Sequence, residues 1–353
     1  METATPTRLT AYSHGAGCGC KIEPATLHQI LAGISNRCNG SDLLVGLEHS
    51  DDAAVYRLDD HQALVFTTDF FTPIVDDAYL YGRIAAANAL SDVYAMGGEA
   101  LLANAIIGFP VGRVSLETVQ EIMRGGADAC EDAGIPLAGG HTIDNPQPIF
   151  GLSAIGIVLI DLLKTNATAQ IGDLLLLTKP LGIGIMTTGI KTGDLSSAGY
   201  DELIGHLAAL NKVGSWVGKQ YGVHAMTDIT GFGIAGHALE MADAAGVRIV
   251  IDTPAVPVME EAWSLVVEGV VPTGAYRNMH SYGDSLYFDD DWDIDHQLVF
   301  ADPQTNGGLL IAVAPERAQN ILRGLREHGC AQAAVVGEVM ARAGSEAPVV
   351  FNR

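Results

Sequence analysis

The sequence predicts a two-domain protein of mixed α/β and α+β structure. The chain has 353 residues, more than twice the roughly 150 residues of an average domain. Short apolar segments of strand length alternate with longer segments of helical character in both halves. A connector, DLLKTNATAQIGD at 161–173, separates the halves, and the apolar pattern starts again after it.

The first half is predicted to form three strands and three helices. Pro24 suits the first turn of a helix, which we expect to run to Leu31. Residues 1–22 before it look like a mobile arm. We expect Gly139-Gly140 to form a turn. The other expected elements are strands at 63–68, 101–109 and 149–160, a helix rich in small residues at 79–96 and an amphipathic helix at 115–132.

The second half is predicted to repeat this mixture of elements. A new strand is expected where LLLLT begins the half, at 174–178. The remaining elements are helices near 201–219, 232–245 and 315–328, and strands near 247–251, 308–313 and 333–339.

The charge and the apolar pattern exclude several classes of partner. A formal net charge of -23 argues against nucleic acid, because binding its phosphates needs clustered Lys and Arg. Nucleotides are not excluded, since magnesium can bridge carboxylates to phosphates. No apolar run is long enough to span a membrane, and METATPTRLTAYSHG does not resemble a signal peptide, so we expect a cytoplasmic protein. Five cysteines, an odd number, then indicate reduced thiols.

Several aspartates stand beside small residues at the ends of apolar segments. Small neighbours let a ligand approach the backbone closely, and carboxylates from separate loops suit several magnesium ions on one polyphosphate. Each could instead cap a helix or end a strand. Asp92 favours a functional role because its alanine-rich surroundings look buried. The set comprises Asp51, Asp52, Asp69, Asp92, Asp228 and Asp302.

The stretch Gly139-Gly140-His141-Thr142 offers backbone N–H groups and a hydroxyl that could cradle phosphate. A plain turn after a strand is the simpler interpretation of this stretch taken alone. The chain has no GxxxxGK[ST] motif and no GxGxxG motif with an acidic residue at the required distance. Neither a P-loop nor a dinucleotide fold is therefore expected.

The N-terminal stretch SHGAGCGCK, at 13–21, has four interpretations. A zinc site would need about four ligands, and there is no second cysteine pair. A disulfide within C-x-C would be strained, and a plain flexible tail seldom carries two thiols. We favour a reactive thiol on a glycine-rich lid, because Lys21 would lower the thiol pKa and could bind phosphate. The glycines would let the lid close over a nucleotide.

A family resemblance rests on this stretch and seven others. In order they are SHGAGCGCK, SDDAAV, TTDFFTPIVDD, NALSDVYAMGG, AGGHTID, LTKPLGIG, AMTDITGFG and DPQTNGG. Together they resemble selenophosphate synthetases (selenide, water dikinases) over almost the whole chain. The wider ATP-binding superfamily, which includes aminoimidazole ribonucleotide synthetase, thiamine-monophosphate kinase and a hydrogenase maturation factor, lacks the Cys-Gly-Cys-Lys arm. The late motif often has Ser where this chain has Asn306.

The resemblance implies an enzyme, a phosphotransferase with paired acceptors. It converts ATP, selenide and water to selenophosphate, AMP and orthophosphate, which supplies selenium for selenocysteine and selenouridine. Cys18 and Lys21 match the catalytic positions, while Cys20 is given no catalytic role. Magnesium would bind at Asp52, Asp92 and Asp228. The nucleotide contacts would be Lys21, His49, Ser50, Asp51, Asp69, Asp92, Gly140, His141 and Thr142.

The resemblance also implies an architecture of the aminoimidazole ribonucleotide synthetase type. A flexible arm (1–17) would precede an N-terminal ATP-binding α/β domain (18–158) that forms a homodimer through a β-barrel-like interface. A C-terminal α+β domain (170–350) would complete a cleft for ATP and several Mg²⁺ ions. The resemblance leaves room for a monovalent cation such as K⁺ and for a selenium-delivery protein.

Two other functions remain open from the residues. A scaffold protein could have kept the ATP-binding fold, although the intact Cys18, Lys21 and aspartates argue against this. A related ATP-dependent ligase or kinase would act on a nucleotide or vitamin precursor and would not need the thiol arm. Selenide-dependent formation of AMP rather than ADP distinguishes the three.

Overall fold

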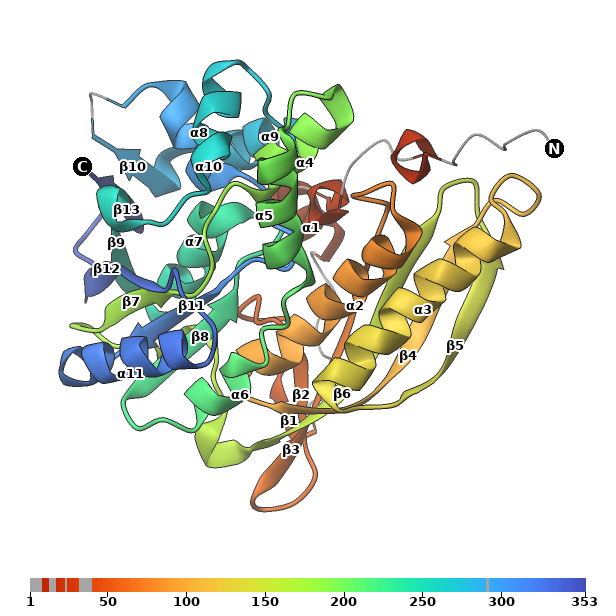
Figure 1. Ribbon diagram of the computed structural model, residues 1–353. Helices are drawn as coiled ribbons and strands as arrows, with labels where there is room; N and C mark the ends of the chain where they lie inside the picture. The colour runs from red at the N-terminus through yellow and green to blue at the C-terminus, as the bar shows by residue number, and fades with distance from the viewer. Residues whose placement is uncertain (1–7, 13–16, 23, 32–39, 290–291) are drawn as a thin grey trace.

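The computed structural model describes residues 8–12, 17–22, 24–31, 40–289 and 292–353 (Figure 1). Two sheets, each carrying its own helices, account for most of the chain. The connector between them includes a short 3-10 turn at Asn166–Thr168. The expectations for residues 1–7 and 13–16 of the arm fall outside the described residues.

The first sheet has six strands in the order β1-β2-β3-β6-β4-β5, and only the β4–β5 pair is parallel. Helices α2 and α3 cover one of its faces (Figure 1). The strands are β1 (Leu43–Val45), β2 (Ala54–Arg57), β3 (Gln62–Phe71), β4 (Glu99–Phe109), β5 (Leu137–Asp144) and β6 (Ile149–Leu159), and the helices are α1 (Pro24–Leu31), α2 (Ala78–Ala95) and α3 (Leu116–Ala133).

The second sheet has seven strands in the order β10-β13-β9-β12-β7-β11-β8. Its strands are β7 (Leu174–Leu177), β8 (Val223–Asp228), β9 (Val247–Asp252), β10 (Leu286–Phe288), β11 (Leu309–Val313), β12 (Ala334–Ala341) and β13 (Val349–Asn352). Its helices are α4 (Ile183–Thr192), α5 (Ser197–Ala208), α6 (Val213–Gly218), α7 (Gly233–Ala245), α8 (Glu260–Val267), α9 (Thr273–Tyr282), α10 (Ile294–Ala301) and α11 (Pro315–Glu327).

Helix α2 is the central element of the molecule. It packs on the first sheet and on α3, and it also contacts α5, α6 and β8 of the second half. Small residues on α2 permit its close packing against α3. A Cβ at Gly82, for example, would lie 1.9 Å from the carbonyl oxygen of Ile122 in α3. The carboxylate of Asp92 and the carboxamide of Asn88 on α2 are therefore placed at the junction of the two sheets.

Most predicted elements are present, and two predictions are wrong. Gly139 and Gly140 lie within strand β5, which pairs in parallel with β4, and do not form a turn. The helix predicted near 201–219 is two helices, α5 and α6, separated at 209–212. In both cases tertiary hydrogen bonding overrides a local preference. Between α5 and α6, for example, the side chain of Asn211 donates a hydrogen bond to Ser91 of α2.

Candidate active site

Four aspartates from separate elements form one cluster at the junction of the sheets. Asp52 precedes β2, Asp69 lies on β3, Asp92 lies on α2 and Asp228 ends β8. We call these four residues the acid cluster. Their charges interact, since Asp228 and Asp92 both act on Asp52, and Asp228 and Asp69 act on Asp92. The chain thus brings carboxylates together from positions up to 176 apart in sequence (52 to 228).

The electrostatics of the cluster disfavour its full ionisation in the protein alone. Burial raises the pKa of Asp52 and Asp92 well above the ordinary range, and the neighbouring carboxylates raise both further. Burial also raises the pKa of Asp228, against a hydrogen bond from Ser91. A cation placed among these groups would relieve this repulsion.

Hydroxyl groups orient two of the carboxylates. Thr67 donates to Asp92, and Thr227 donates to Oδ1 of Asp52 over 2.9 Å. Within the described part of the chain, Oδ2 of Asp228 is buried and has no hydrogen-bond partner. Such an orphaned buried oxygen is costly unless a ligand completes it.

Lys21 provides a positive charge beside the cluster. Its Nζ lies 3.6 Å from Oδ2 of Asp69. Burial lowers the pKa of Lys21, but Asp69, followed by Cys18 and Asp92, outweighs this effect, and the net pKa is raised. Lys21 is therefore a permanent cation, suited to hold a phosphate oxygen.

Asn88 connects the thiol to the cluster. Its Oδ1 accepts a hydrogen bond from Sγ of Cys18 at 3.3 Å, and its Nδ2 donates to Asp69 at 2.6 Å. The same Oδ1 accepts the backbone N–H of Asn306 at 2.7 Å. One carboxamide therefore holds the thiol, a cluster carboxylate and the DPQTNGG loop in a fixed arrangement.

The Cys18 thiol lies in a packed core and not on an exposed surface of the predicted lid. Gly17–Cys20 is a short 3-10 turn, and Cys18 is fully buried in the core that contains α2. Its backbone N–H donates to Oγ1 of Thr305, and Gly17 donates to the carbonyl of Thr72. Glycine at 17 has a left-handed φ of 51°, and a Cβ there would meet Thr305 at 2.3 Å. The glycines thus serve close packing against both halves of the molecule.

His49, Ser50 and Asp51 lie at the edge of this site. His49 and Ser50 are exposed and line a cavity of about 460 Å³ together with Phe232, Gly236 and Tyr282 of the second half. Asp51 accepts the backbone N–H of Asn166 at 2.7 Å. Burial raises the pKa of Asp51, with this hydrogen bond acting against it.

Gly140, His141 and Thr142 are not brought to the acid cluster of the same chain. They lie exposed on edge strand β5, and the register aligns Gly140 with Asp69 across β4 and β6. Three strand spacings place them roughly 14 Å apart. A Cβ at Gly140 would lie 2.1 Å from the carbonyl oxygen of Ala105, so strand packing alone requires this glycine.

The carboxylates of the acid cluster are the donors that could hold a metal ion. Across the residues described, no three His, Cys, Asp or Glu side chains form a ready metal-ligand group. Magnesium usually keeps several waters and is held by one or two carboxylates plus substrate phosphates. The acid cluster, with its orphaned Asp228 oxygen, fits such loosely held ions better than a closed metal cage.

Three contributors to the site were not identified from sequence as functional residues. They are Asn88, Asn306 and Lys179. Lys179 is buried and donates to the carbonyl oxygens of Asn306 and Ala209, both at 2.8 Å. Asn306 has a left-handed φ of 49° and donates from its side chain to Leu207 and Ala209. All three residues lie in motifs of the family resemblance, NALSDVYAMGG, LTKPLGIG and DPQTNGG, but their roles depend on contacts between distant segments.

The fold and the sequence define the class of AIR synthase related proteins. Residues 50–158 match the family model of the AIR synthase related protein N-terminal domain, and residues 170–350 match that of its C-terminal domain. The solved structure of hydrogenase maturation protein HypE in complex with ATP is 21% identical, with a TM-score of 0.66 over 98% of this chain and 94% of that one. Thiamine-monophosphate kinase from Stenotrophomonas maltophilia is 20% identical, with a TM-score of 0.63 over 93% and 95% of the two chains.

Sequence relatives narrow this class to one enzyme. The chain is 47% identical to a selenide, water dikinase of Burkholderia pseudomallei over 96% of each chain. It is 48% identical to that of Aeromonas hydrophila over 96% of this chain and 97% of the relative. The chain belongs to the selenide, water dikinase family, and the predicted activity, selenophosphate synthesis from ATP, is confirmed.

Proposed function

We propose that selenophosphate is made at the junction of the two sheets, between Lys21, Cys18 and the acid cluster. The observation that carries this proposal is the shared contact at Asn88, which places the Cys18 thiol and Asp69 on one carboxamide. A thiol, a permanent cation and four carboxylates beside one another suit phosphoryl transfer to a selenium nucleophile. Neither a scaffold nor a vitamin-precursor kinase would need that thiol.

The overall reaction consumes ATP, selenide and water and yields selenophosphate, AMP and orthophosphate. In the first step a selenium–phosphorus bond forms as the bond between the γ-phosphorus and the bridging oxygen breaks, which leaves ADP. In the second step water takes the β-phosphoryl group, which gives AMP and orthophosphate. Lys21 would hold a phosphate oxygen in both steps, and Cys18 would receive and orient the selenium.

Asp52, Asp92 and Asp228 would hold Mg²⁺ ions together with the phosphates, and the ions would offset the charge on the phosphoryl oxygens. The raised pKa values of these carboxyl groups and the partnerless oxygen of Asp228 support this assignment. The hydroxyls of Thr67 and Thr227 keep the carboxylates oriented without neutralising them.

The nucleoside would occupy the cavity lined by His49, Ser50, Phe232 and Tyr282. This cavity of about 460 Å³ adjoins Asp51 and Asp52, so that a base bound there directs its phosphates toward the acid cluster. It also draws residues from both halves of the chain, which fits the expected cleft between the two domains, 18–158 and 170–350.

A homodimer through the open face of the first sheet completes the proposal. Phe66 and Tyr56 are 46% and 49% exposed on the first sheet, and Phe66 aligns with Ile155 and Leu102 across it. Such an apolar face marks an interaction site. His141 aligns with Phe70 on this same face, so that Gly140–Thr142 would reach a nucleotide across the dimer and not within one chain.

The remaining expectations stay proposals of the same kind. Among described residues no helix is long and apolar enough to cross a membrane. A monovalent cation such as K⁺ and a selenium-delivery protein are proposed from the family resemblance, and a cytoplasmic location is proposed from the apolar pattern of the sequence.

Substitution of the three proposed metal ligands tests the site. Asp52→Asn, Asp92→Asn and Asp228→Asn should each lower selenide-dependent AMP formation at least about tenfold and raise the Mg²⁺ concentration needed for half-maximal rate. Asp201→Asn, an exposed change on α5, is the matched control. Wild-type Mg²⁺ dependence in all three variants would contradict the assignment.

A further inference from the structure

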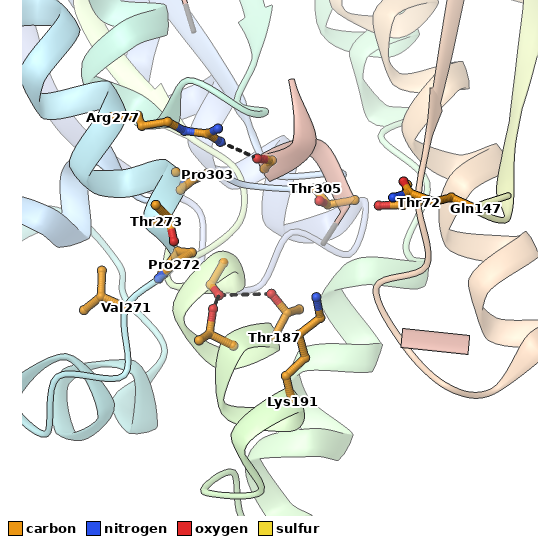
Figure 2. Close-up of a pocket in the computed structure, with 14 residues that line it drawn as sticks. Thr72, Gln147, Thr187, Lys191, Val271, Pro272, Thr273, Arg277, Pro303 and Thr305 are labelled. Atoms are coloured by element: carbon orange, nitrogen blue, oxygen red, sulfur yellow. Dashed lines mark hydrogen bonds between the residues drawn. The ribbon is translucent and has the colours of Figure 1, made fainter. Parts of the chain in front are cut away.

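A second cavity lies behind the Cys18 segment, away from the acid cluster. It has a volume of about 540 Å³ and is lined by both halves of the chain, including Gly19, Thr72, Gln147, Lys191, Arg277 and Thr305 (Figure 2). Gly19 and Thr305 belong to its wall, whereas the Cys18 thiol is directed to Asn88. Residues 17–20 therefore separate this cavity from the proposed phosphoryl-transfer site.

The charge of the lining selects for an anion. Lys191 of α4 and Arg277 of α9 both point into the cavity (Figure 2), and the described residues that line it include no Asp or Glu. This is unexpected in a chain with 42 acidic and 19 basic residues. The cavity thus presents two cations where most of the molecule would repel an anion.

The nearby carboxylates are already engaged by other groups. Asp76, the carboxylate that acts on Lys191, accepts hydrogen bonds from Thr10 and forms an ion pair with Arg8. Asp302 lies behind Gly184 and accepts the N–H of Gly184 at 2.9 Å and the side chain of Gln304 at 2.7 Å. Neither carboxylate lines the cavity.

Donors for a small anion come from both sides. The hydroxyls of Thr187 and Thr188 are not among these donors, because both donate their hydrogen to the carbonyl oxygen of Gly184. Arg277 donates one N–H to the carbonyl of Gly19 at 2.8 Å, and a guanidinium has five donors in all. Lys191, Arg277 and the hydroxyl of Thr305 therefore surround the space next to the Cys18 backbone.

We infer that this cavity binds selenide, as the hydroselenide monoanion, before it reaches Cys18. The inference rests on the proposed function and names the binding site of its second substrate. Mg-ATP is a poorer occupant, because the described residues that line the cavity include no carboxylate to hold its Mg²⁺ ions. Binding is electrostatic and breaks no covalent bond. Passage to the phosphoryl-transfer site requires residues 17–20 to shift.

Separate Michaelis constants for the two substrates test the inference. Lys191→Met should raise the KM for selenide about tenfold, since a charge-assisted hydrogen bond contributes about 1.5 kcal/mol or more. The KM for ATP and kcat at saturating selenide should stay within about twofold. Lys191→Arg should recover most of the loss. Lys219→Met, which removes an exposed lysine paired with Glu99, is the matched control.

Hydrosulfide, as a probe, gives a readout that does not depend on turnover of selenide. Its inhibition constant against selenide should rise in Lys191→Met and in Arg277→Met, with thermal stability unchanged. An unaltered KM for selenide in both variants, or a rise in the KM for ATP instead, would overturn the inference. The proposed function would still stand if the wild type forms AMP in a selenide-dependent way, and it fails if the wild type does not.

Discussion

At the scale of single residues, the carboxamide of Asn88 determines how the thiol meets the acid cluster. Its oxygen accepts from Cys18 and from the Asn306 backbone, and its nitrogen donates to Asp69. Asn306 can hold this position because Asn tolerates the left-handed backbone there, and its own side chain is anchored on Leu207 and Ala209. The departure from the more frequent Ser at this position is therefore structurally supported.

Cys18→Ser should abolish selenide-dependent AMP formation, to below about 1% of the wild-type rate, because a hydroxyl cannot replace the polarisable thiol that would receive and orient the selenium. The serine can still donate to Asn88, so thermal stability and the affinity for Mg-ATP should change little. Rates are measured by separating AMP from ADP. Cys330→Ser, at a half-buried thiol outside the site, serves as control. Wild-type turnover in Cys18→Ser would exclude a chemical role for the thiol.

Asp302 should make folding stability depend on pH. Burial raises its pKa from 3.8 to about 7, so the folded protein binds an additional proton between these values. Its contribution to stability is complete below about pH 4 and is lost as the pH rises through about 7. Each pKa unit corresponds to about 1.4 kcal/mol, which bounds the effect at about 4 kcal/mol.

Asp302→Asn cannot titrate and should therefore flatten the change in the free energy of unfolding between pH 4 and 7. Urea unfolding at a series of pH values measures this. Asp201→Asn, an exposed change, should leave the profile parallel to that of the wild type. If Asp302→Asn also runs parallel, Asp302 keeps an ordinary pKa in the folded protein.

At the scale of elements, the first sheet has one covered and one open face. Thr67, Asp69 and Phe71 of β3 face α2, whereas Phe66 and Phe70 face outward. The period of two along a strand thus places the site on one face and an apolar surface on the other. Dimerisation through the open face would cover that surface.

Phe66→Lys should weaken this dimer at least about tenfold, because a buried aromatic anchor commonly contributes more than 1 kcal/mol to an interface. The association constant is measured by sedimentation equilibrium, with circular dichroism to confirm folding. Tyr221→Lys introduces the same charge at a residue that is 81% exposed in the second half. Equal association of the two variants would place the interface elsewhere.

At the scale of the whole molecule, strand β5 carries predicted nucleotide contacts that its own acid cluster does not approach. The separation is roughly 14 Å, set by two intervening strands. A partner chain docked on the open face could bring its β5 to the nucleotide. Each of two sites would then combine the Asp228 of one chain with the His141 of the other.

Mixing two inactive variants tests this arrangement. In a heterodimer of Asp228→Asn and His141→Ala chains, one site would carry both changes and the other site neither. An equimolar mixture, refolded or co-expressed, should therefore recover about a quarter of the wild-type AMP formation if activity depends on both residues. Phe66→Lys in both chains should remove this recovery. Absence of any recovery in stable heterodimers would mean that both residues serve the same chain.

Much of the fold followed from local patterns. The long helices α2 and α3 and strands β3, β4 and β6 were predicted within a few residues, because their apolar periodicity extends over many positions. Short elements such as β1, β10, α8 and α9 gave no such signal. Gly139-Gly140 was misassigned because a glycine pair favours a turn locally, while pairing with β4 fixes it in a strand.

By itself the sequence determined the family, the alternation of strands and helices in two halves, and the candidate catalytic and binding residues. Only the tertiary structure decided which of them meet. It buried Cys18 against α2, joined the thiol to Asp69 through Asn88, gathered the four carboxylates and kept Gly140–Thr142 away from them. The physical reason is that residue types and local periodicity are properties of short segments. Distances among β3, α2, β8 and the N-terminal turn depend on how the two sheets pack around one central helix.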